Sequence, residues 1–285
     1  MILEFIKIEH LTHVFKSSDE KKDGIKALDD INLNIDRGEF VAVIGVNGSG
    51  KSTLAKHLNG LLLPTEGACF VDGIKVEDNA DIWKVRQKVS MVFQNPDNQI
   101  IATIVEDDIA FGPENMGLPR EEIRERVDFA LKSLHIEHLR GFAPHLLSGG
   151  QKQLTAIAGA IAMRTNCLVL DEPTAMLDPQ GRIAVMKALK ELHEKYNMTI
   201  IMITHFMEEA MQAQRIIVMD NGKVIQDGTP KQIFENKQKL HSLGLEVPLS
   251  ADIADELRRR GIKISADVFT AKQLAEELGK IALCQ

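Results

Sequence analysis

The sequence predicts an α/β fold with a mainly parallel sheet. Segments of strand length alternate along the chain with segments whose apolar residues recur at helical spacing. Several of the strand-like segments are almost entirely apolar, as at 40–45, 167–170 and 199–204, which is typical of parallel strands covered by helices on both faces. The length of 285 residues allows one large domain, or one domain with a small appendage.

The first half of the chain supplies short apolar runs separated by glycines and polar turns. Each run is too short for a helix, whereas the stretch after Gly50 has helical character. The elements expected here are strands at 2–10, 39–44, 67–71 and 88–93, a polar turn at 19–26, and a helix at 51–62.

Helical spacing dominates the middle of the chain. Apolar residues recur every three or four positions between 120 and 138, and residues 150–163 and 182–196 are also expected to be helical. Asn221-Gly222 separates two apolar runs, at 215–219 and 223–226. This dipeptide is the strongest short signal for a β-hairpin.

The pattern changes after about residue 236. A short amphipathic helix is expected at 250–260, stopped by Gly261, and Thr270 to Gln273 fit a capping box that opens a second helix. We therefore expect a main domain at 1–235, with a helical subdomain at about 95–165, and a small helical extension at 236–285.

Composition excludes several classes of protein. Lys and Arg total 34 against 41 Asp and Glu, a net charge of −7, whereas nucleic-acid binders usually carry a basic surplus. With 11 Phe, 1 Trp and 1 Tyr, the chain is also poor in rings for base stacking. No apolar run approaches the roughly 20 residues that span a membrane. Three widely spaced cysteines, Cys69, Cys167 and Cys284, favour free thiols in a reducing cytosol.

The acidic surplus is concentrated in one stretch. Residues 95–119 contain no Lys or Arg but five acidic residues, which gives this stretch a charge of −5. These five are Asp97, Glu106, Asp107, Asp108 and Glu114.

A phosphate-binding motif follows the strand expected at 39–44. Residues 45–52 read Gly-Val-Asn-Gly-Ser-Gly-Lys-Ser and match G-x-x-x-x-G-K-[ST] between a strand and a helix, the context that this motif requires. The glycines let backbone N–H groups converge on phosphates, and the helix N-terminus adds partial positive charge. We expect Lys51 to reach the β- and γ-phosphates and Ser52 to bind Mg²⁺. The predicted nucleotide-binding residues are Gly45, Asn47, Gly48, Ser49, Gly50, Lys51, Ser52 and Thr53.

Two carboxylates end the apolar strand at 167–170. Acids at the end of a buried strand are costly unless they have a partner. Asp171 suits the coordination shell of Mg²⁺, and Glu172 suits a general base that orients water for attack on the γ-phosphate.

Three more segments complete the predicted site. Gln94 ends a strand and can contact Mg²⁺ or the attacking water, and His205 follows a strand at the same sheet edge, where it can hold the γ-phosphate. Ser148-Gly149-Gly150-Gln151 opens a helix and can bind another anion. Two phosphate-binding surfaces in one chain indicate a head-to-tail dimer, in which each ATP lies between Lys51 of one subunit and Ser148 of the other.

Taken together, these motifs resemble those of the ABC ATPases, in the family's order over about residues 3–235. The resemblance implies a P-loop NTPase core that hydrolyses ATP with Mg²⁺, and it makes 1–235 the ATP-binding domain. It also implies that Phe15 stacks on adenine and that Asp178 belongs to the loop that faces the second subunit.

The segments Gln94-Asn-Pro-Asp-Asn-Gln99 and 106–115 are more distinctive, and resemble the ATPase subunits of energy-coupling factor (ECF) importers of cobalt and vitamins. The resemblance implies a second ATPase, a transmembrane coupling protein and a substrate-binding membrane subunit. It places the chain at the cytoplasmic face of the cell membrane, and it implies that the C-terminal extension helps the ATPases to associate. The segment Ala175-Met-Leu-Asp178 favours a paralogous partner, hence a heterodimer. We expect the acidic stretch to accept arginines of the coupling protein.

One departure from the family and several alternatives stay open. Leu154 stands where the family commonly has Arg, which puts any account of that helix in doubt. A soluble ABC ATPase with a non-membrane partner is the main alternative. A regulator without turnover is disfavoured because Glu172 and His205 are present, and a GTPase because no base-reading motif is found. His135 and His138 are expected to be exposed helical residues and not metal ligands.

Overall fold

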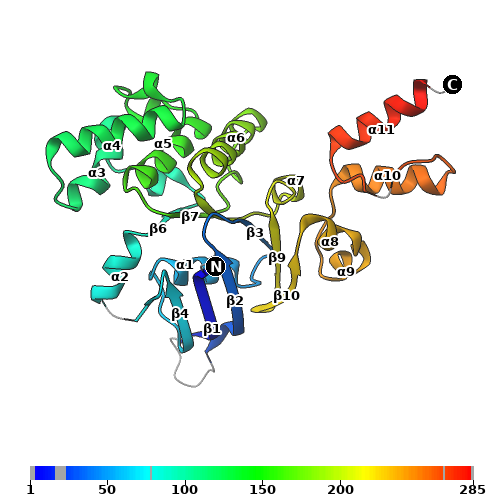
Figure 1. Ribbon diagram of the computed structural model, residues 1–285, viewed down its shortest axis with the longest axis horizontal. Coiled ribbons are helices and arrows are strands. Elements are labelled where there is room, and N and C mark those ends of the chain that lie inside the picture. The colour runs from blue at the N-terminus through cyan, green and yellow to red at the C-terminus, as the bar shows by residue number, and fades with distance from the viewer. Residues whose placement is uncertain (1–3, 17–23, 78, 266, 284–285) are drawn as a thin grey trace.

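The computed structural model describes residues 4–16, 24–77, 79–265 and 267–283, and within them the expected parallel sheet is present. Six strands lie in the order β10-β9-β3-β8-β7-β6, and all neighbours pair parallel except β9 and β10 (Figure 1). The apolar central strands are buried on both faces, as their sequences predicted. The strands are β3 (Phe40–Ile44), β6 (Val89–Val92), β7 (Cys167–Asp171), β8 (Thr199–Ile203), β9 (Arg215–Asp220) and β10 (Lys223–Gly228).

A second, antiparallel sheet was not predicted. Its order is β2-β1-β4-β5, with β1 (Glu4–Phe15), β2 (Ile25–Asp36), β4 (Glu66–Val71) and β5 (Ile74–Lys75). The sequence alternates apolar and polar residues along β2, which buries Leu28, Ile31, Leu33 and Ile35 in the core shared with the parallel sheet. The polar turn expected at 19–26 lies largely outside the described residues.

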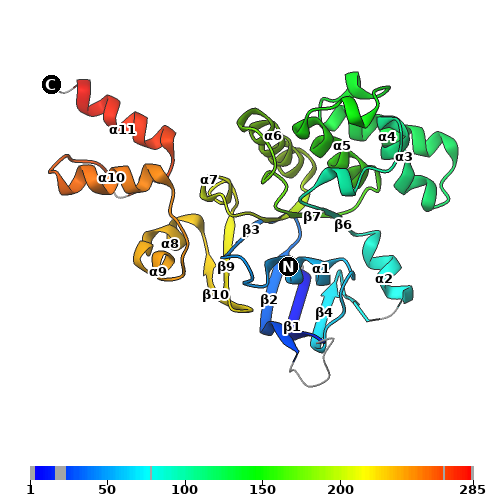
Figure 2. The same cartoon turned by 180° about the vertical axis from the view of Figure 1, so that it is seen from behind.

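Helices gather at one end of the parallel sheet. In both views α3, α4 and α5 lie together beyond β6 and β7, with α6 beside them (Figures 1 and 2). The large core that they share with the sheet includes Leu154, which is only 8% exposed. Leucine therefore fits this position, because it packs in an apolar environment. The helices are α1 (Lys51–Leu58), α2 (Asn79–Arg86), α3 (Val105–Asn115), α4 (Arg120–Ser133), α5 (Gly149–Ala162), α6 (Pro179–Tyr196) and α7 (Met207–Ala210).

The predicted hairpin at Asn221-Gly222 is confirmed. Asn221 and Gly222 both adopt positive φ, 47° and 76°, as the tight hairpin between β9 and β10 requires. The helix expected at 120–138 instead ends at Ser133, so the prediction of a helical residue was wrong for His135, whereas both His135 and His138 are exposed, as predicted. His135 adopts a positive φ of 56° and contacts Glu191, and His138 lies in a 3₁₀ turn. No group of three potential metal-binding side chains is found among the described residues.

The C-terminal extension has a small core of its own. It follows α8 (Pro230–Glu235) and consists of α9 (Lys237–Ser242), α10 (Leu249–Arg259) and α11 (Ala271–Leu283). Ala254, Ile264, Val268 and Leu274 form this core, and the predicted capping box is present, with Gln273 N–H donating to Thr270 Oγ1. The described helices include none with the length and apolar character that a membrane span needs. Cys69 and Cys167 are buried free thiols, and Cys284 lies outside the described residues.

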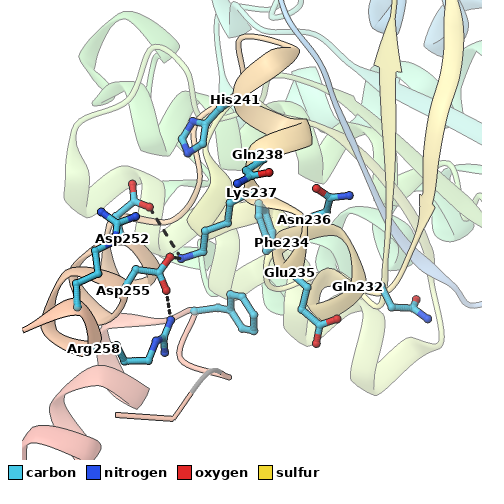
Figure 3. Close-up of a pocket in the computed structure, with 12 residues that line it drawn as sticks. Gln232, Phe234, Glu235, Asn236, Lys237, Gln238, His241, Asp252, Asp255 and Arg258 are labelled. Atoms are coloured by element: carbon cyan, nitrogen blue, oxygen red, sulfur yellow. Dashed lines mark hydrogen bonds and ion pairs between the residues drawn. The ribbon is translucent and has the colours of Figure 1, made fainter. Parts of the chain in front are cut away.

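Ion pairs join α9 to α10 within the extension. Lys237 at the start of α9 contacts Asp255 of α10, and Arg258 contacts the same carboxylate. Figure 3 shows these three side chains pointing toward one another in a pocket of about 670 Å³ between α8, α9 and α10. Because the charges in this pocket are paired with one another, they serve to hold α9 and α10 together.

Candidate nucleotide-binding and hydrolysis site

The phosphate-binding loop runs from the end of β3 to the start of α1. Gly48 and Gly50 adopt φ of 81° and 102°, a region that side-chain-bearing residues rarely enter. Gly45 is needed for a different reason, since a Cβ there would lie 2.3 Å from the Met219 carbonyl oxygen. No side chain caps the N-terminus of α1, so its backbone N–H groups face the loop.

Lys51 is buried under this loop. Its Nζ donates to the carbonyl oxygens of Gly45 at 2.8 Å and Val46 at 3.0 Å. Burial lowers the pKa of Lys51, while the charges of Glu172 and Asp171 act in the opposite direction. The lysine is thus held at the loop by bonds to its own backbone, in a position from which it can reach a phosphate.

Two predicted Mg²⁺ ligands from distant segments meet directly. Ser52 Oγ donates to Asp171 Oδ1 at 2.9 Å, although the two residues are 119 positions apart. Burial raises the pKa of Asp171, and the hydrogen bond from Ser52 acts in the opposite direction. A hydroxyl and a carboxylate oxygen are the kind of ligands that Mg²⁺ takes, so these residues fit the ion.

Glu172 lies at the centre of the predicted catalytic residues. Its Oε2 accepts a hydrogen bond from Gln94 Nε2 at 3.0 Å, and His205 Nδ1 lies 3.6 Å from the same oxygen. Glu172 has a positive φ of 50°, and its N–H donates to the Ile203 carbonyl oxygen at 3.0 Å. The structure therefore brings Gln94, Glu172 and His205 together at the carboxyl ends of β6, β7 and β8.

Phe15 and the remaining loop residues surround this centre less tightly. Phe15 is 43% exposed at the end of β1, and its ring packs edge-to-face on His13. His13 Nδ1 lies 3.1 Å from His57 Nε2, while His57 Nδ1 bonds to the Thr53 carbonyl oxygen at 2.7 Å. The ring of Phe15 is thereby connected to α1. Asn47 is exposed at the loop tip, and Ser49 is buried.

The segment 148–151 is organised around its own helix. Ser148 Oγ accepts from Gln151 N–H at 3.3 Å, and the Gln151 side chain accepts from Ser148 N–H at 2.9 Å, which is a capping box. Among the described residues, no hydrogen bond joins this segment to Lys51 or Ser52. The structure thus does not bring Ser148 into the constellation around Lys51.

Two glycines let this segment pack on α6. A Cβ on Gly150 would lie 2.8 Å from the Gly181 Cα, so the starts of α5 and α6 touch backbone to backbone. Asp178 is the N-cap of α6, and its Oδ1 accepts from Gly181 N–H at 3.1 Å. Ser148 to Gln151 and Asp178 therefore form one rigid unit, with Gly149 lying against Leu177.

Three of the five carboxylates in the acidic stretch already have partners within the chain. Lys152 Nζ contacts Asp97 at 2.7 Å, and Arg140 contacts Glu106 at 2.6 Å. Asp108 accepts hydrogen bonds from two backbone N–H groups, those of Ile101 and Ala102. Asp97, Asp107 and Glu114 are exposed, and of these Asp107 and Glu114 lie on α3. The basic partners, Lys152 and Arg140, lie beyond residue 119, so the net charge of residues 95–119 does not include them.

An apolar groove lies beside the acidic stretch. It has a volume of about 330 Å³ and is lined by residues that follow Gln94 and by the facing sides of α3 and α5. Small residues form its floor, and Ile101 and Phe111 at its rim are 61% and 47% exposed. The lining residues include Ile101, Phe111, Gly112, Ala156, Gly159 and Met163.

Sequence reasoning missed one set of residues next to the catalytic centre. Thr174, Thr204 and Glu209 form a buried hydrogen-bonded cluster directly behind Glu172 and His205. Two of the three are neighbours of predicted catalytic residues in the sequence. Glu209 gives no such signal, because it lies in a run of polar and apolar residues that looks like an ordinary helix.

Comparison with known proteins agrees with this geometry. The family model described as "ABC transporter" matches residues 28–175. The ECF transporter ATP-binding protein EcfA1 of Clostridium novyi is 52% identical over 278 residues, covering 98% of both chains. That of Clostridioides difficile is 50% identical over 273 residues, which is 96% of this chain and 98% of the relative.

Solved structures give the same result for the fold. CbiO1 from Clostridium perfringens, described as part of the ABC transporter complex CbiONQ, superposes with a TM-score of 0.74 at 42% identity. The match covers 86% of this chain and 96% of CbiO1. The ATP-binding cassette MJ0796, in a dimer with bound ADP and phosphate, gives a TM-score of 0.70 at 33% identity, with coverage of 79% and 98%. The chain therefore belongs to the ABC transporter family, as one of its ECF-type ATP-hydrolysing subunits.

Proposed function

We propose that this ABC ATPase powers an importer of vitamins or transition-metal ions from the cytoplasmic face of the cell membrane. One observation carries the catalytic part of the proposal. Gln94, Glu172 and His205 converge on one point beside the loop that holds Lys51, and Ser52 and Asp171 meet next to it. No other arrangement of the described polar residues offers both a phosphate cradle and a base.

Each residue then has a distinct part in hydrolysis. Lys51 exchanges its bonds to the loop carbonyls for bonds to the β- and γ-phosphates of ATP. Glu172 accepts the proton of the attacking water, Gln94 orients that water, and His205 contacts the γ-phosphate. Ser52, Asp171 and Gln94 would hold Mg²⁺, which neutralises phosphate charge when bound. Phe15 stacks on the adenine ring.

The ATP site is completed by a second ATP-binding subunit, which we propose to be a paralogue. Ser148 and the N-terminus of α5 have no contact with the P-loop of their own chain among the described bonds, yet they present a serine and free N–H groups. The second subunit supplies its own segment of this kind to the nucleotide bound at Lys51. Asp178 lies at the same face, where it caps α6.

The C-terminal extension supports this association. Leu249 is 67% exposed, and Ile253 and Leu278 are 41% and 40% exposed on its two amphipathic helices. Apolar side chains in this number on one small unit favour a protein contact. We propose that they pack against the corresponding part of the second ATPase.

The transmembrane coupling protein docks at the groove between α3 and α5. An apolar floor, an exposed aromatic rim and the carboxylates of Asp107 and Glu114 fit a cytoplasmic helix that carries apolar residues and arginines. The groove follows Gln94, so movement at the nucleotide passes directly to the docked helix. A further membrane subunit binds the imported substrate.

A charge reversal tests the docking. Asp107→Lys is expected to reduce co-purification of the membrane subunits with the full-length chain, because it removes an acceptor for arginine and adds repulsion. Glu121→Lys is the matched control, since Glu121 is also an exposed acid in the first turn of a subdomain helix, α4. Both variants should bind ATP as before.

The two possible failures point to different errors. If both variants retain the membrane subunits equally, the docking surface is elsewhere. If the unaltered chain recovers no membrane protein and instead a soluble partner, the chain is a soluble ABC ATPase and the importer proposal is wrong.

A further inference from the structure

A buried glutamate on α7 binds both loops that carry the catalytic residues. Glu209 is only 3% exposed. Thr174 Oγ1 donates to its Oε1 at 2.6 Å, and Thr204 Oγ1 donates to its Oε2 at 2.7 Å. Each carboxylate oxygen therefore accepts one hydrogen bond, and the two donors come from different segments of the chain.

The two threonines are close neighbours of the catalytic residues. Thr174 follows Glu172 by two positions, and Thr204 immediately precedes His205. Each hydrogen bond restricts the movement of the loop that carries the threonine, because both threonines are 1% exposed and fixed by packing. Together with the bond from Glu172 N–H to the Ile203 carbonyl oxygen, this side chain thus helps to set the relative position of Glu172 and His205.

Each threonine also fixes backbone in its own loop. Thr204 Oγ1 accepts from Phe206 N–H at 3.0 Å while it donates to Glu209, so its hydroxyl is used in both directions. On the other side, the Thr174 carbonyl oxygen accepts from Leu177 N–H at 3.1 Å, in the turn that leads to Asp178. Glu209 therefore lies between the turn of His205 and the loop that faces the second subunit.

A carboxylate in such a place is costly to keep. Burial raises the pKa of Glu209, and the two threonine bonds and the charge of Arg182 partly offset this. The guanidinium of Arg182 lies over the ring of Phe206, 3.7 Å from its centre, which ties α6 to the same turn. If this position served only to pack the core, an apolar residue would be more stable there. The buried glutamate therefore points to a role beyond packing.

We propose that Glu209 is a positioning residue for ATP hydrolysis, which holds the Glu172 loop and the His205 turn in one fixed arrangement through Thr174 and Thr204. The inference rests on the proposed roles of Glu172 and His205. Glu209 acts through its bonds to Thr174 and Thr204. It keeps Glu172 and His205 in a fixed position relative to each other and to Asp178.

The competing view is that the cluster merely stabilises the fold. The chain offers a matched control for that view in Thr199, at the opposite end of β8 from Thr204. Thr199 is fully buried, and its hydroxyl accepts a hydrogen bond from Gly38 N–H at 2.8 Å. Thr199→Val therefore removes a comparable buried hydroxyl far from the catalytic centre.

The experiment measures kcat, KM for ATP and Tm of the full-length chain purified with its co-expressed partners. Thr174→Val and Thr204→Val are each expected to lower kcat about tenfold or more, because small displacements of catalytic groups cost that much. KM should change less than about twofold, since the P-loop and Phe15 are untouched. Thr174→Ser and Thr204→Ser keep the hydroxyl and should restore kcat.

A double variant separates positioning from general destabilisation. Because both threonines act through Glu209, Thr174→Val with Thr204→Val should lower kcat no further than the worse single variant. Thr199→Val should lower Tm to a similar extent and leave kcat unchanged.

Three results would overturn the proposal: unchanged kcat in both valine variants, multiplicative losses in the double variant, or a loss of kcat in Thr199→Val that matches its loss of Tm. Glu172→Gln, run in parallel, shows whether the underlying assignment holds. If that variant keeps normal turnover, the proposed base is wrong, whatever the threonine variants do.

Discussion

The two phosphate-binding surfaces of this chain are built in opposite ways. Around Lys51, residues from four separate segments are joined by hydrogen bonds across the sheet edge, as in Ser52 with Asp171, Gln94 with Glu172 and Glu172 with Ile203. Ser148, in contrast, bonds within its own helix, and its segment packs on Leu177 and on the start of α6. One surface is a preassembled half-site, and the other is presented outward for a second subunit.

The fold explains the contrast. Carboxyl ends of parallel strands meet at one edge, so β3, β6, β7 and β8 deliver their residues to a common point. The segment 148–151 lies in the helical subdomain, which Figure 1 shows grouped apart from the P-loop helix α1. We therefore expect the chain by itself to bind nucleotide, and hydrolysis to require both surfaces.

The largest expected effect comes from the preassembled half-site. Glu172→Gln should lower the ATP turnover number about 10²–10⁴-fold, the usual cost of losing a general base, because the amide no longer accepts the proton of water. ATP binding and ATP-dependent association of subunits should persist, since Lys51 and Ser148 are intact. Steady-state hydrolysis and ATP-binding assays measure the two properties. Near-normal hydrolysis would remove Glu172 from the mechanism.

A smaller effect is expected from the presented surface. Ser148→Ala should reduce turnover about 10²-fold, comparable to losing one preorganised donor to a reacting phosphate or oxyanion. The affinity of the isolated chain for ATP should stay unchanged, because Ser148 does not contact its own P-loop.

Thr229 provides the control for Ser148. It caps α8 with the same capping box, in which Gln232 takes the place of Gln151, so Thr229→Ala loses an equivalent cap worth about 1 kcal/mol. If Thr229→Ala lowers turnover as much as Ser148→Ala does, the loss at Ser148 reflects helix stability, and the contrast between the two surfaces fails.

The smallest expected effect concerns His57, which supports the preassembled half-site through its contact with His13. Burial lowers the pKa of His57 from 6.5 to about 4, so the unfolded chain binds a proton there that the folded chain does not. Stability should therefore decline as pH falls from about 6.5 to 4, by up to about 3 kcal/mol from this residue alone. Denaturant unfolding at several pH values measures the decline. His57→Gln should flatten it, and His138→Gln, at an exposed position, should not. Equal slopes in all three proteins would contradict the account.

Much of this half-site was predictable because its chemistry is local in sequence. Residues 45–52 and the Asp171-Glu172 strand end carry motif, strand and helix together, and Asn221-Gly222 adopts the positive φ angles that its own residue types favour. Thr270 and Gln273 cap their helix for the same reason.

The missed features depend on residues far away in the chain. The pairing of Asp97 with Lys152 and of Glu106 with Arg140 joins segments 55 and 34 positions apart, so the charge of residues 95–119 alone was misleading. Strand β2 was missed because its alternation is interrupted at Asp30, which adopts a positive φ of 54°. The burial of Glu209 arises only when α7 folds against the loops of β7 and β8.

The central claim is that the presented surface of one subunit completes the preassembled half-site of another. Sedimentation velocity of the full-length Glu172→Gln chain with its second ATP-binding subunit, with and without Mg²⁺-ATP, tests it directly. The account predicts an ATP-dependent dimer, and it predicts that adding Ser148→Arg to this chain abolishes the dimer while ATP binding to the chain persists. An ATP-dependent dimer that forms equally well with Arg at position 148 would contradict it.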